Sequence, residues 1–383
     1  MSKVVGIETL TDRAGTGAPD FTNGFNINGS DSGISGFAHT ESANEPSSPS
    51  NGDAWLDTDN NIYKVYINGE WKDWLGTTAA AFTWGGDRNV YHVGYGASPS
   101  SPTDTIEYFS ISSAGNGSDF GNLTAARHSV GGACSNGTRG VFAGGRETGY
   151  VNKIEYITTS TTGNAQDFGD LSDTAARNMA TSDGTRGVIA LGKSSSSTLN
   201  NIEYITIAST GNSTDFGDLS SASIAWGSAF NDATRSVIND GSSDAATAIM
   251  EYVTTQTTGN ATDFGDHLNG EQHSACSDAT RGLICGGETA AAGGSRTNVI
   301  SYVTTQTTGN SADFGDLTAA RSRSGSASDG TYGTTVGGRS AANSAINTID
   351  RVTIQTLGNS TDHGDMSAHS GGQYVDSLSG AAS

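Results

Sequence analysis

Long apolar runs are missing from this sequence. No stretch reaches the roughly 18 apolar residues that a transmembrane helix needs. The start, MSKVVGIETLTDR, also lacks the apolar core and the cleavage site of a secretory signal peptide. We therefore expect a protein that is synthesised in a cytoplasm and does not insert into a membrane.

Basic residues are scarce as well. The chain has 19 Lys and Arg against 40 Asp and Glu, which gives a formal net charge of −21. Contacts with nucleic-acid phosphates need clustered Lys and Arg, so we expect no binding to DNA or RNA. A neutral or basic surface suits such an acidic chain better as a partner, although the acidity is also explained by solubility alone.

Cysteine is limited to Cys134, Cys276 and Cys285, and the seven histidines show no metal-ligand spacing. Zinc sites take ligands in close pairs, which are absent here. Cys134 and Cys276 fall at the same position of two repeat units, where other units have Thr181 or Ala327. We interpret these cysteines as small buried residues, and we expect no metal and no cofactor.

Apolar residues make up only 34% of the 383 residues, whereas glycine alone contributes 53. A chain of this length holds two or three ordinary domains, or one large all-β ring with an appendage. The apolar residues stand in short regular runs between turn residues. This pattern favours finely divided β structure over disorder.

One phrase, written TTGNATDFGDH at 257–267, occurs in similar form six times. Each copy follows a strand-like segment, and these segments start at Ile106, Ile154, Ile202, Met250, Ile300 and Ile349. The spacings of 48, 48, 48, 50 and 49 residues are typical of stacked or radial repeats. Asp-Phe-Gly also occurs in kinase active sites, but a kinase needs it once and needs a His-Arg-Asp loop, which is absent. The phrase is therefore interpreted as architecture.

One full unit, 125–171, predicts four strands of about five or six residues, which with short turns fill such a period. We expect strands around His128–Cys134, Gly140–Ala143, Ile154–Thr159 and Ala165–Gly169. In the TGN turn, Gly and Asn are expected to adopt positive φ. The Phe of DFGD is expected to pack between neighbouring blades, with the flanking Asp residues bonding backbone N–H groups.

The order of an Arg before the first strand, Gly-Gly after the second, a Tyr in the third and an aromatic in the fourth resembles kelch-repeat β-propellers over 80–383. The structural repeat residues are Tyr108, Tyr156, Tyr204, Tyr252 and Tyr302, with Phe120, Phe168, Phe216, Phe264 and Phe314. The phenylalanines stand where kelch repeats usually have Trp. The resemblance implies an all-β, six-bladed propeller, with seven blades as the alternative. The segment 369–380 is expected to complete the first blade and close the ring.

Connections between the second and third strands differ in length and chemistry from unit to unit, while the turns of the opposite face repeat. Binding residues on rigid scaffolds concentrate in such variable loops. Arg146, Tyr150, Arg296 and Arg339 are the candidate ligand-binding residues there. Relaxed drift of solvated loops explains the variation equally well.

Residues 44–79 predict a small β-meander with strands in AWLD, IYKVYI and EWKDW and a hairpin turn at Asn68-Gly69. We expect its Trp-rich surface to be buried against a neighbour. Asp57 to Asn61 has some features of a calcium loop, but a plain turn is favoured because the Gly and the final Glu are missing.

The meander resembles a module of tail-fibre and other virion proteins of tailed bacteriophages, and residues 1–43 resemble N-terminal arms of such proteins, cyanophage ones especially. The resemblance implies a virion component made in the host cytoplasm, whose arm (1–43) serves for attachment to other tail proteins or for oligomerisation. A trimer is usual for fibre-like proteins, but no heptad repeat supports it.

The leading hypothesis is a phage tail-fibre, tail-tip or adaptor component whose propeller presents variable loops to a host-surface glycan or protein. A non-adhesive virion scaffold or decoration protein is one alternative. A propeller glycosidase or lyase acting on host polysaccharide is another, since it needs only two converging carboxylates. An intracellular adaptor of the kelch kind is a third. We expect no enzymatic activity.

Overall fold

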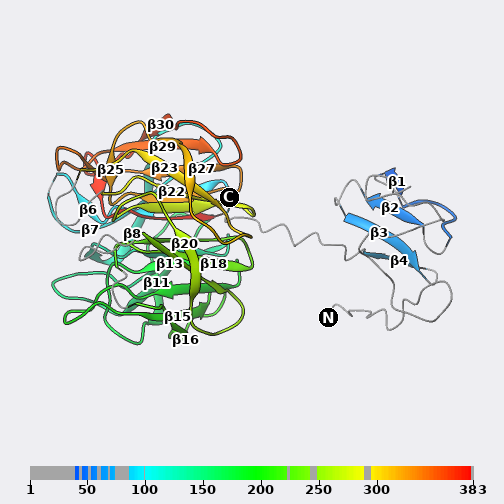
Figure 1. The fold of residues 1–383 in the computed structure, drawn as a ribbon, viewed down its shortest axis with the longest axis horizontal. Coiled ribbons are helices and arrows are strands. Elements are labelled where there is room, and N and C mark those ends of the chain that lie inside the picture. Colours follow the sequence, from blue (N-terminus) through cyan, green and yellow to red (C-terminus); the bar gives the residue numbers. More distant parts are fainter. Residues whose placement is uncertain are drawn as a thin grey trace. The chain divides into compact units, whose positions relative to one another are not determined.

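The computed structural model describes residues 39–42, 45–50, 53–57, 62–67, 70–73, 86–98, 100–221, 225–241, 248–288 and 295–380. The chain divides into two compact units, Met1–Ala81 and Phe82–Ser383 (Figure 1). Residues 1–38, the turns at 58–61 and 68–69, and Trp74 lie outside the described residues, together with the predictions made for them.

The first unit contains one four-stranded sheet, in the order β1 (His39–Ser42), β2 (Ala54–Asp57), β3 (Ile62–Ile67) and β4 (Glu70–Asp73). The last three are the strands expected from the sequence. β1 pairs parallel with β2, so the sheet includes residues that the sequence analysis assigned to the arm.

Within this sheet Trp55 is only 4% exposed. Its indole N–H donates to the carbonyl of Ser42 at 2.9 Å, and its ring lies edge-on to Trp71 at 5.5 Å. Trp71 in turn packs edge-on against Tyr66 at 5.3 Å. The aromatic side chains therefore form a small core of their own on one sheet.

The second unit is a six-bladed β-propeller built from six four-stranded antiparallel sheets (Figure 1). Blades are numbered along the chain, and their strands are given from the central axis outward. The first three blades are β32 (Asp376–Gly380), β5 (Arg88–His92), β7 (Thr103–Ser110) and β8 (Ser118–Arg127); β9 (Gly132–Ser135), β10 (Arg139–Ala143), β11 (Lys153–Thr158) and β12 (Gln166–Asp170); and β13 (Met179–Ser182), β14 (Arg186–Ala190), β15 (Asn201–Thr206) and β16 (Thr214–Asp218). The other three are β17 (Ser228–Asn231), β18 (Arg235–Asn239), β19 (Ile249–Thr254) and β20 (Thr262–Asp266); β21 (Ser274–Ser277), β22 (Arg281–Cys285), β23 (Val299–Thr304) and β24 (Ala312–Asp316); and β26 (Gly325–Ser328), β27 (Tyr332–Val336), β29 (Thr348–Thr353) and β30 (Thr361–Asp365).

The ring closes through the C-terminal strand. β32 pairs antiparallel with β5, from Asp376 opposite His92 to Gly380 opposite Arg88. The innermost strands contact one another in a complete circle, with β26 against β32 and β32 against β9. The predicted closure and the six blades are confirmed, and the seven-bladed alternative is wrong. Closure matters because an open ring would expose strand edges to other chains.

The repeated TGN and DFGD phrases join each blade to the next. In the third blade, Gly211 N–H donates to Phe168 O at 2.7 Å and Ser213 N–H donates to Asp170 O at 2.9 Å. The side-chain oxygen of Asn212 accepts from the N–H of Asp170 at 3.0 Å. The same three bonds recur at all six blade junctions, including the one that joins the sixth blade to the first.

Two details of the predicted turn are therefore wrong. Five of the six Gly residues have positive φ, and Gly115 does not. None of the Asn residues has positive φ, and each Asn side chain instead accepts a hydrogen bond from the neighbouring blade. The second Asp of DFGD bonds through its backbone rather than its carboxylate. Among the described residues, the carboxylate of Asp362 makes a bond of the predicted kind, accepting from Gly364 N–H at 3.2 Å.

The aromatic residues of the repeat fill the spaces between blades. Phe120 lies in one buried cluster with Val90 and Ile106 of its own blade and with Phe142 and Ile157 of the next. Each Phe also packs edge-on against the Tyr of its own blade, at 5.9 to 6.1 Å. In the sixth blade His363 stands in place of the Phe and packs on Phe109 of the first.

The Glu of the strand-like segment is buried and also crosses a blade junction. Glu155 accepts from the N–H of Thr124 in the preceding blade at 3.1 Å and forms an ion pair with Arg127 at 2.6 Å, with both side chains almost fully buried. In the sixth blade Asp350 forms the equivalent ion pair with Arg321 at 3.1 Å. Polar side chains thus connect the blades alongside the apolar packing.

Candidate ligand-binding site at the channel mouth

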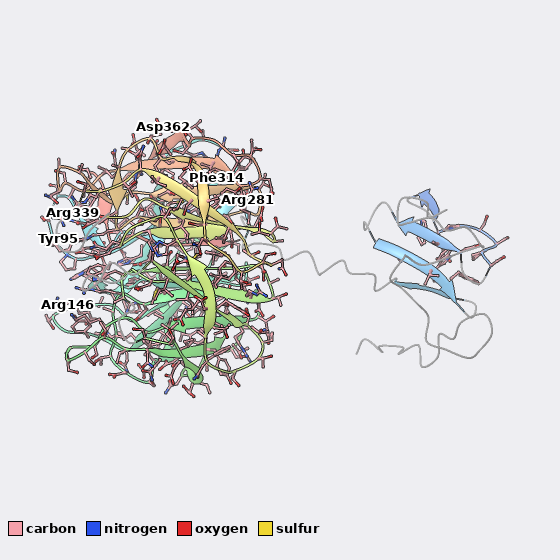
Figure 2. The ribbon with its side chains drawn as sticks, viewed as in Figure 1. Tyr95, Arg146, Arg281, Phe314, Arg339 and Asp362 are labelled. Atoms are coloured by element: carbon pink, nitrogen blue, oxygen red, sulfur yellow. The ribbon has the colours of Figure 1, made fainter. Side chains whose placement is uncertain are left out.

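The two faces of the ring are built differently. Alternating antiparallel strands place the first-to-second and third-to-fourth turns on one face, and the repeated inter-blade bonds lie there. The other face, here called the mouth face, carries the second-to-third loops and the segments that lead into the innermost strands. Figure 2 shows Tyr95, Arg146 and Arg339 on one side of the propeller and Arg281 toward the other.

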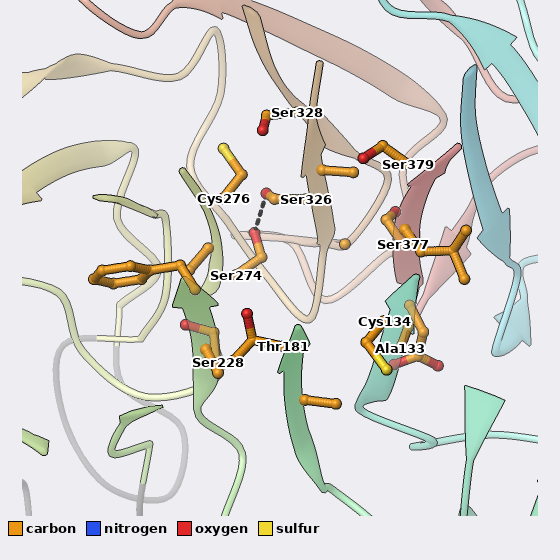
Figure 3. A pocket seen from close by; sticks show the side chains of 18 of the residues that line it. Ala133, Cys134, Thr181, Ser228, Ser274, Cys276, Ser326, Ser328, Ser377 and Ser379 are labelled. Atoms are coloured by element: carbon orange, nitrogen blue, oxygen red, sulfur yellow. Dashed lines mark hydrogen bonds between the residues drawn. The ribbon is translucent and has the colours of Figure 1, made fainter. Parts of the chain in front are cut away.

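A cavity of about 160 Å³ follows the propeller axis and is lined by all six innermost strands (Figure 3). Its lining is mostly Ser, Ala, Gly and Cys, because only small side chains fit where six strands converge. Some of the polar groups bond across blades, as in the 2.7 Å hydrogen bond between the hydroxyls of Ser274 and Ser326. Cys134 and Cys276 are buried here as free thiols, so their interpretation as small buried residues is confirmed.

One residue with positive φ precedes each innermost strand. These six residues are Ser129 (54°), Arg177 (61°), Trp226 (70°), Gln272 (61°), Arg323 (61°) and Tyr374 (57°). Positive φ is unfavourable for residues with large side chains and is usually occupied by Gly or Asn. The predicted first strand of the second blade begins later than expected, at Gly132, because Ser129 and Gly131 both adopt this conformation.

Backbone bonds connect several of these positions across blades. Arg177 N–H donates to Ser129 O at 2.7 Å, and Gln272 N–H donates to Trp226 O at 3.0 Å. Arg323 N–H donates to Gln272 O at 2.7 Å. Ser129, Arg177, Trp226, Gln272 and Arg323 are therefore positioned by a neighbouring blade as well as by their own.

The side chains of Arg177, Trp226, Gln272, Arg323 and Tyr374 form what we call the rim cluster. They line a second cavity of about 60 Å³. This cavity and the axial cavity have several lining residues in common. Gln272 is buried, and the other four side chains are half-buried.

Trp226 and Tyr374 come from opposite sides of the ring, the fourth and the first blade. Their rings are stacked, with centroids 5.4 Å apart and planes 30° apart, so the pair spans the channel mouth. The guanidinium of Arg177 lies 3.6 Å from the Trp226 centroid, and that of Arg323 lies 4.6 Å from the Tyr374 centroid. Arg323 also donates to the side-chain oxygens of Gln272 and Tyr374.

The candidate residues from the sequence all lie on the mouth face. The structure brings Arg146 and Tyr150 of the second blade together, whereas Arg296 and Arg339 belong to the fifth and sixth blades. Arg146 and Tyr150 form a cation–π pair at 5.5 Å, with Arg146 exposed. The largely buried guanidinium of Arg296 already forms an ion pair with Glu288 at 3.1 Å. Arg339 is half-buried and pairs in a short two-stranded sheet, β28 (Arg339–Ser340) with β25 (Arg321–Ser322).

Positive charges crowd around the rim cluster. Burial lowers the pKa of Arg177, nearby Tyr150 and Tyr374 oppose this, and Arg323 and Arg146 lower it further. Burial likewise lowers the pKa of His128 to about 4, with Arg146 and Arg177 adding to the effect. An acidic protein therefore carries a local positive centre at the channel mouth.

The sequence did not predict the rim cluster. Trp226, Gln272, Arg323 and Tyr374 belong to no repeated phrase, so the repeat gives no signal for them. Arg177 ends the phrase TAAR (174–177), which also occurs at 124–127 and 318–321. In those two copies the Arg is buried in an ion pair, so the phrase does not predict a side chain at the channel mouth. Among the described residues, no group of His, Cys, Asp or Glu side chains is arranged to hold a metal ion, and no helix is long and apolar enough to cross a membrane. The chain matches no model of a known protein family, and no curated protein matches its sequence.

Proposed function

We propose that the chain is a tail-fibre, tail-tip or adaptor component of a phage virion, whose propeller recognises a receptor on the host surface. The N-terminal segment serves for attachment to other tail proteins. Recognition is by binding, without catalysis. The resemblance of the meander to tail-fibre modules and of the repeats to kelch propellers supports the virion setting.

The rim cluster is the observation that carries the recognition role. Bulky aromatic and basic side chains occupy backbone positions where they are unfavourable, and such outliers cluster at functional sites. Four of these side chains remain partly exposed at the centre of one face. If these residues served only to fill the channel, small side chains would be sufficient, as they are along the rest of the axis.

The distribution of variation around the ring supports the same role. From the last Gly of the second strand to the start of the third-strand segment, the connection varies from 9 to 13 residues. The opposite face repeats the same turns and inter-blade bonds in every unit. A fixed frame with variable loops on one face is the usual arrangement of a binding scaffold.

Two measurements test the proposal. Immunogold labelling of purified particles of the phage that encodes the chain should place it on the tail, and unlabelled particles would contradict the virion role. The labelled full-length chain should bind saturably to cells of the phage's host and should slow phage adsorption. Binding to particles without any binding to host cells would instead support a scaffold or decoration protein.

A further inference from the structure

We propose that the rim cluster binds a saccharide that carries an oxyanion group, with Arg177 and Arg323 holding the anion. This inference rests on the proposed recognition role of the mouth face, and it names the chemistry of the ligand. It concerns residues at the channel mouth rather than the loop residues that the sequence suggested.

The first argument is uncompensated positive charge. On the described mouth face, Arg296 forms an ion pair with Glu288, and Lys153 forms one with Glu147. No ion pair among the described residues includes Arg177 or Arg323. Partly desolvated guanidinium groups without a carboxylate are unfavourable by themselves and become favourable when an anion binds.

The second argument is the hydrogen-bonding capacity that remains. A guanidinium has five N–H donors in a planar fork, which matches the oxygens of a carboxylate, sulfate or phosphate. Arg323 uses two of its nitrogens for Gln272 and Tyr374, and these bonds fix its orientation. Arg177 is positioned by stacking over Trp226, and its guanidinium makes no hydrogen bond among the described residues. Its donors are therefore available to a ligand.

The third argument concerns the sugar. A saccharide ring has an apolar C–H face and a rim of hydroxyls, and it needs an aromatic surface with polar groups beside it. Trp226 and Tyr374 supply rigid aromatic surface, and the Tyr374 hydroxyl and the Gln272 amide supply polar groups. A bare inorganic anion has no apolar face that could pack on the stacked pair.

The fourth argument is electrostatic. The formal net charge is −21, so a polyanionic ligand is repelled by most of the protein surface. Burial lowers the pKa of Arg177 and of Arg323; Arg323 and Arg146 lower that of Arg177 further, and Arg339 and Arg296 lower that of Arg323 further. Five arginines therefore lie near one another around the mouth. An anionic ligand is thus directed to this one place.

Isothermal titration calorimetry on the full-length chain provides the test. The probes are oligomers of glucuronic acid, glucose 6-sulfate and glucose 6-phosphate, with glucose oligomers as the neutral probe and inorganic phosphate as the bare anion. At least one anionic saccharide should bind saturably and more tightly than both the neutral sugar and inorganic phosphate. The tightest of the three identifies the anionic group. Equal binding of neutral and anionic probes, or no binding of any saccharide, would overturn the proposal.

The decisive variant is Arg177→Gln, because no hydrogen bond among the described residues is lost with it. We expect it to weaken binding by about tenfold or more, equivalent to about 1.4 kcal/mol or more, since charge-assisted hydrogen bonds to the oxyanion are lost. Lys153→Gln removes the same charge from outside the rim cluster and should change affinity less than about twofold. Arg177→Lys keeps the charge without the planar fork and should fall in between. Unchanged affinity in Arg177→Gln, in a protein with the unfolding midpoint of the original chain, would overturn the assignment.

Failure of this inference is distinguishable from failure of the proposed function. If the chain binds host cells but Arg177→Gln binds them equally well, receptor recognition stands and the rim cluster is not its site. If the acidic oligomers bind at Arg177, but the chain neither binds host cells nor is found on phage particles, the assignment of the site stands and the proposed virion role is wrong.

Discussion

Arg351 stacks on Tyr332 in the sixth blade, with the guanidinium 4.5 Å from the ring centroid, and the two residues have exchanged strands. In the other five blades the Arg begins the second strand and the Tyr lies in the third, as with Arg281 and Tyr302 at 4.6 Å. The exchange preserves the contact to the next blade. Arg351 donates to Ser112 O at 2.7 Å, and Arg281 donates to Ile354 O at 2.9 Å. One requirement, a guanidinium between an aromatic ring and the neighbouring blade, is therefore met in two ways.

Reversing this exchange tests that requirement. Arg351→Tyr alone removes the guanidinium, and Tyr332→Arg alone places two guanidinium groups side by side. Each should lower the free energy of unfolding by about 1–3 kcal/mol. The double variant recreates the arrangement of the other blades and should recover most of that loss in urea unfolding. Losses that simply add in the double variant would show that the two side chains act independently.

Much of this architecture was predictable because it repeats. A residue type that recurs six times at a fixed spacing, such as the Gly of TGN, is required by geometry that also recurs. The blade number, the four strands and the closing C-terminal strand followed from that. The function of the Asn did not, because a side chain that bonds a neighbouring blade looks the same in sequence as one that shapes its own turn.

The rim cluster was not predictable for the opposite reason. Trp226 and Tyr374 are far apart in the chain and belong to units that differ at these positions. Only closure of the ring places them on opposite sides of one axis, close enough to stack. The four loop candidates were chosen by chemistry and by their place in variable loops, whereas the cluster depends on backbone positions that sequence patterns do not reveal.

Closure of the ring through β32 predicts a large effect at Leu378. This side chain is 3% exposed and packs in the cluster that joins the first two blades. Leu378→Ala should lower the free energy of unfolding by about 2–5 kcal/mol, since it leaves a cavity at the closing strand. Leu268 is 60% exposed, so Leu268→Ala should change it by less than about 0.5 kcal/mol. Similar unfolding midpoints for the two variants would mean that the closing strand contributes little to stability.

The close approach of neighbouring blades predicts a difference between two glycines of the repeated phrases. Gly163 (φ +158°) has open space where a Cβ would stand, whereas a Cβ on Gly169 (φ +151°) would lie 2.3 Å from the carbonyl oxygen of Gly211. Gly163→Ala should cost only the backbone strain, about 1–3 kcal/mol. Gly169→Ala should cost about 1–3 kcal/mol more, because the blades must separate to admit the methyl group. Thermal unfolding of the two variants side by side measures the difference, and equal midpoints would argue against tight contact at this junction.

The buried His273 predicts how stability changes with pH. Burial lowers its pKa to about 3, with His267 adding to the effect and the hydrogen bond to Asp240 O opposing it. The pKa of a His in an unfolded chain is about 6.5. Between about pH 6.5 and pH 3 the unfolded chain therefore binds a proton that the folded chain does not, so stability falls as the pH is lowered through this window. Above it the imidazole is neutral in both states and contributes no pH dependence.

His273→Gln removes this proton uptake. The variant should be less stable than the original chain at pH 7, because the bonds to Ser228 and Asp240 are altered. It should nevertheless lose less additional stability between pH 7 and pH 4.5, because one destabilising protonation is gone. Urea unfolding of both proteins at the two pH values gives the comparison directly, and the carboxylates shared by both proteins cancel from it. An equal or larger loss in the variant would mean that His273 is protonated in the folded propeller, and that the channel mouth is more open to solvent than its burial indicates.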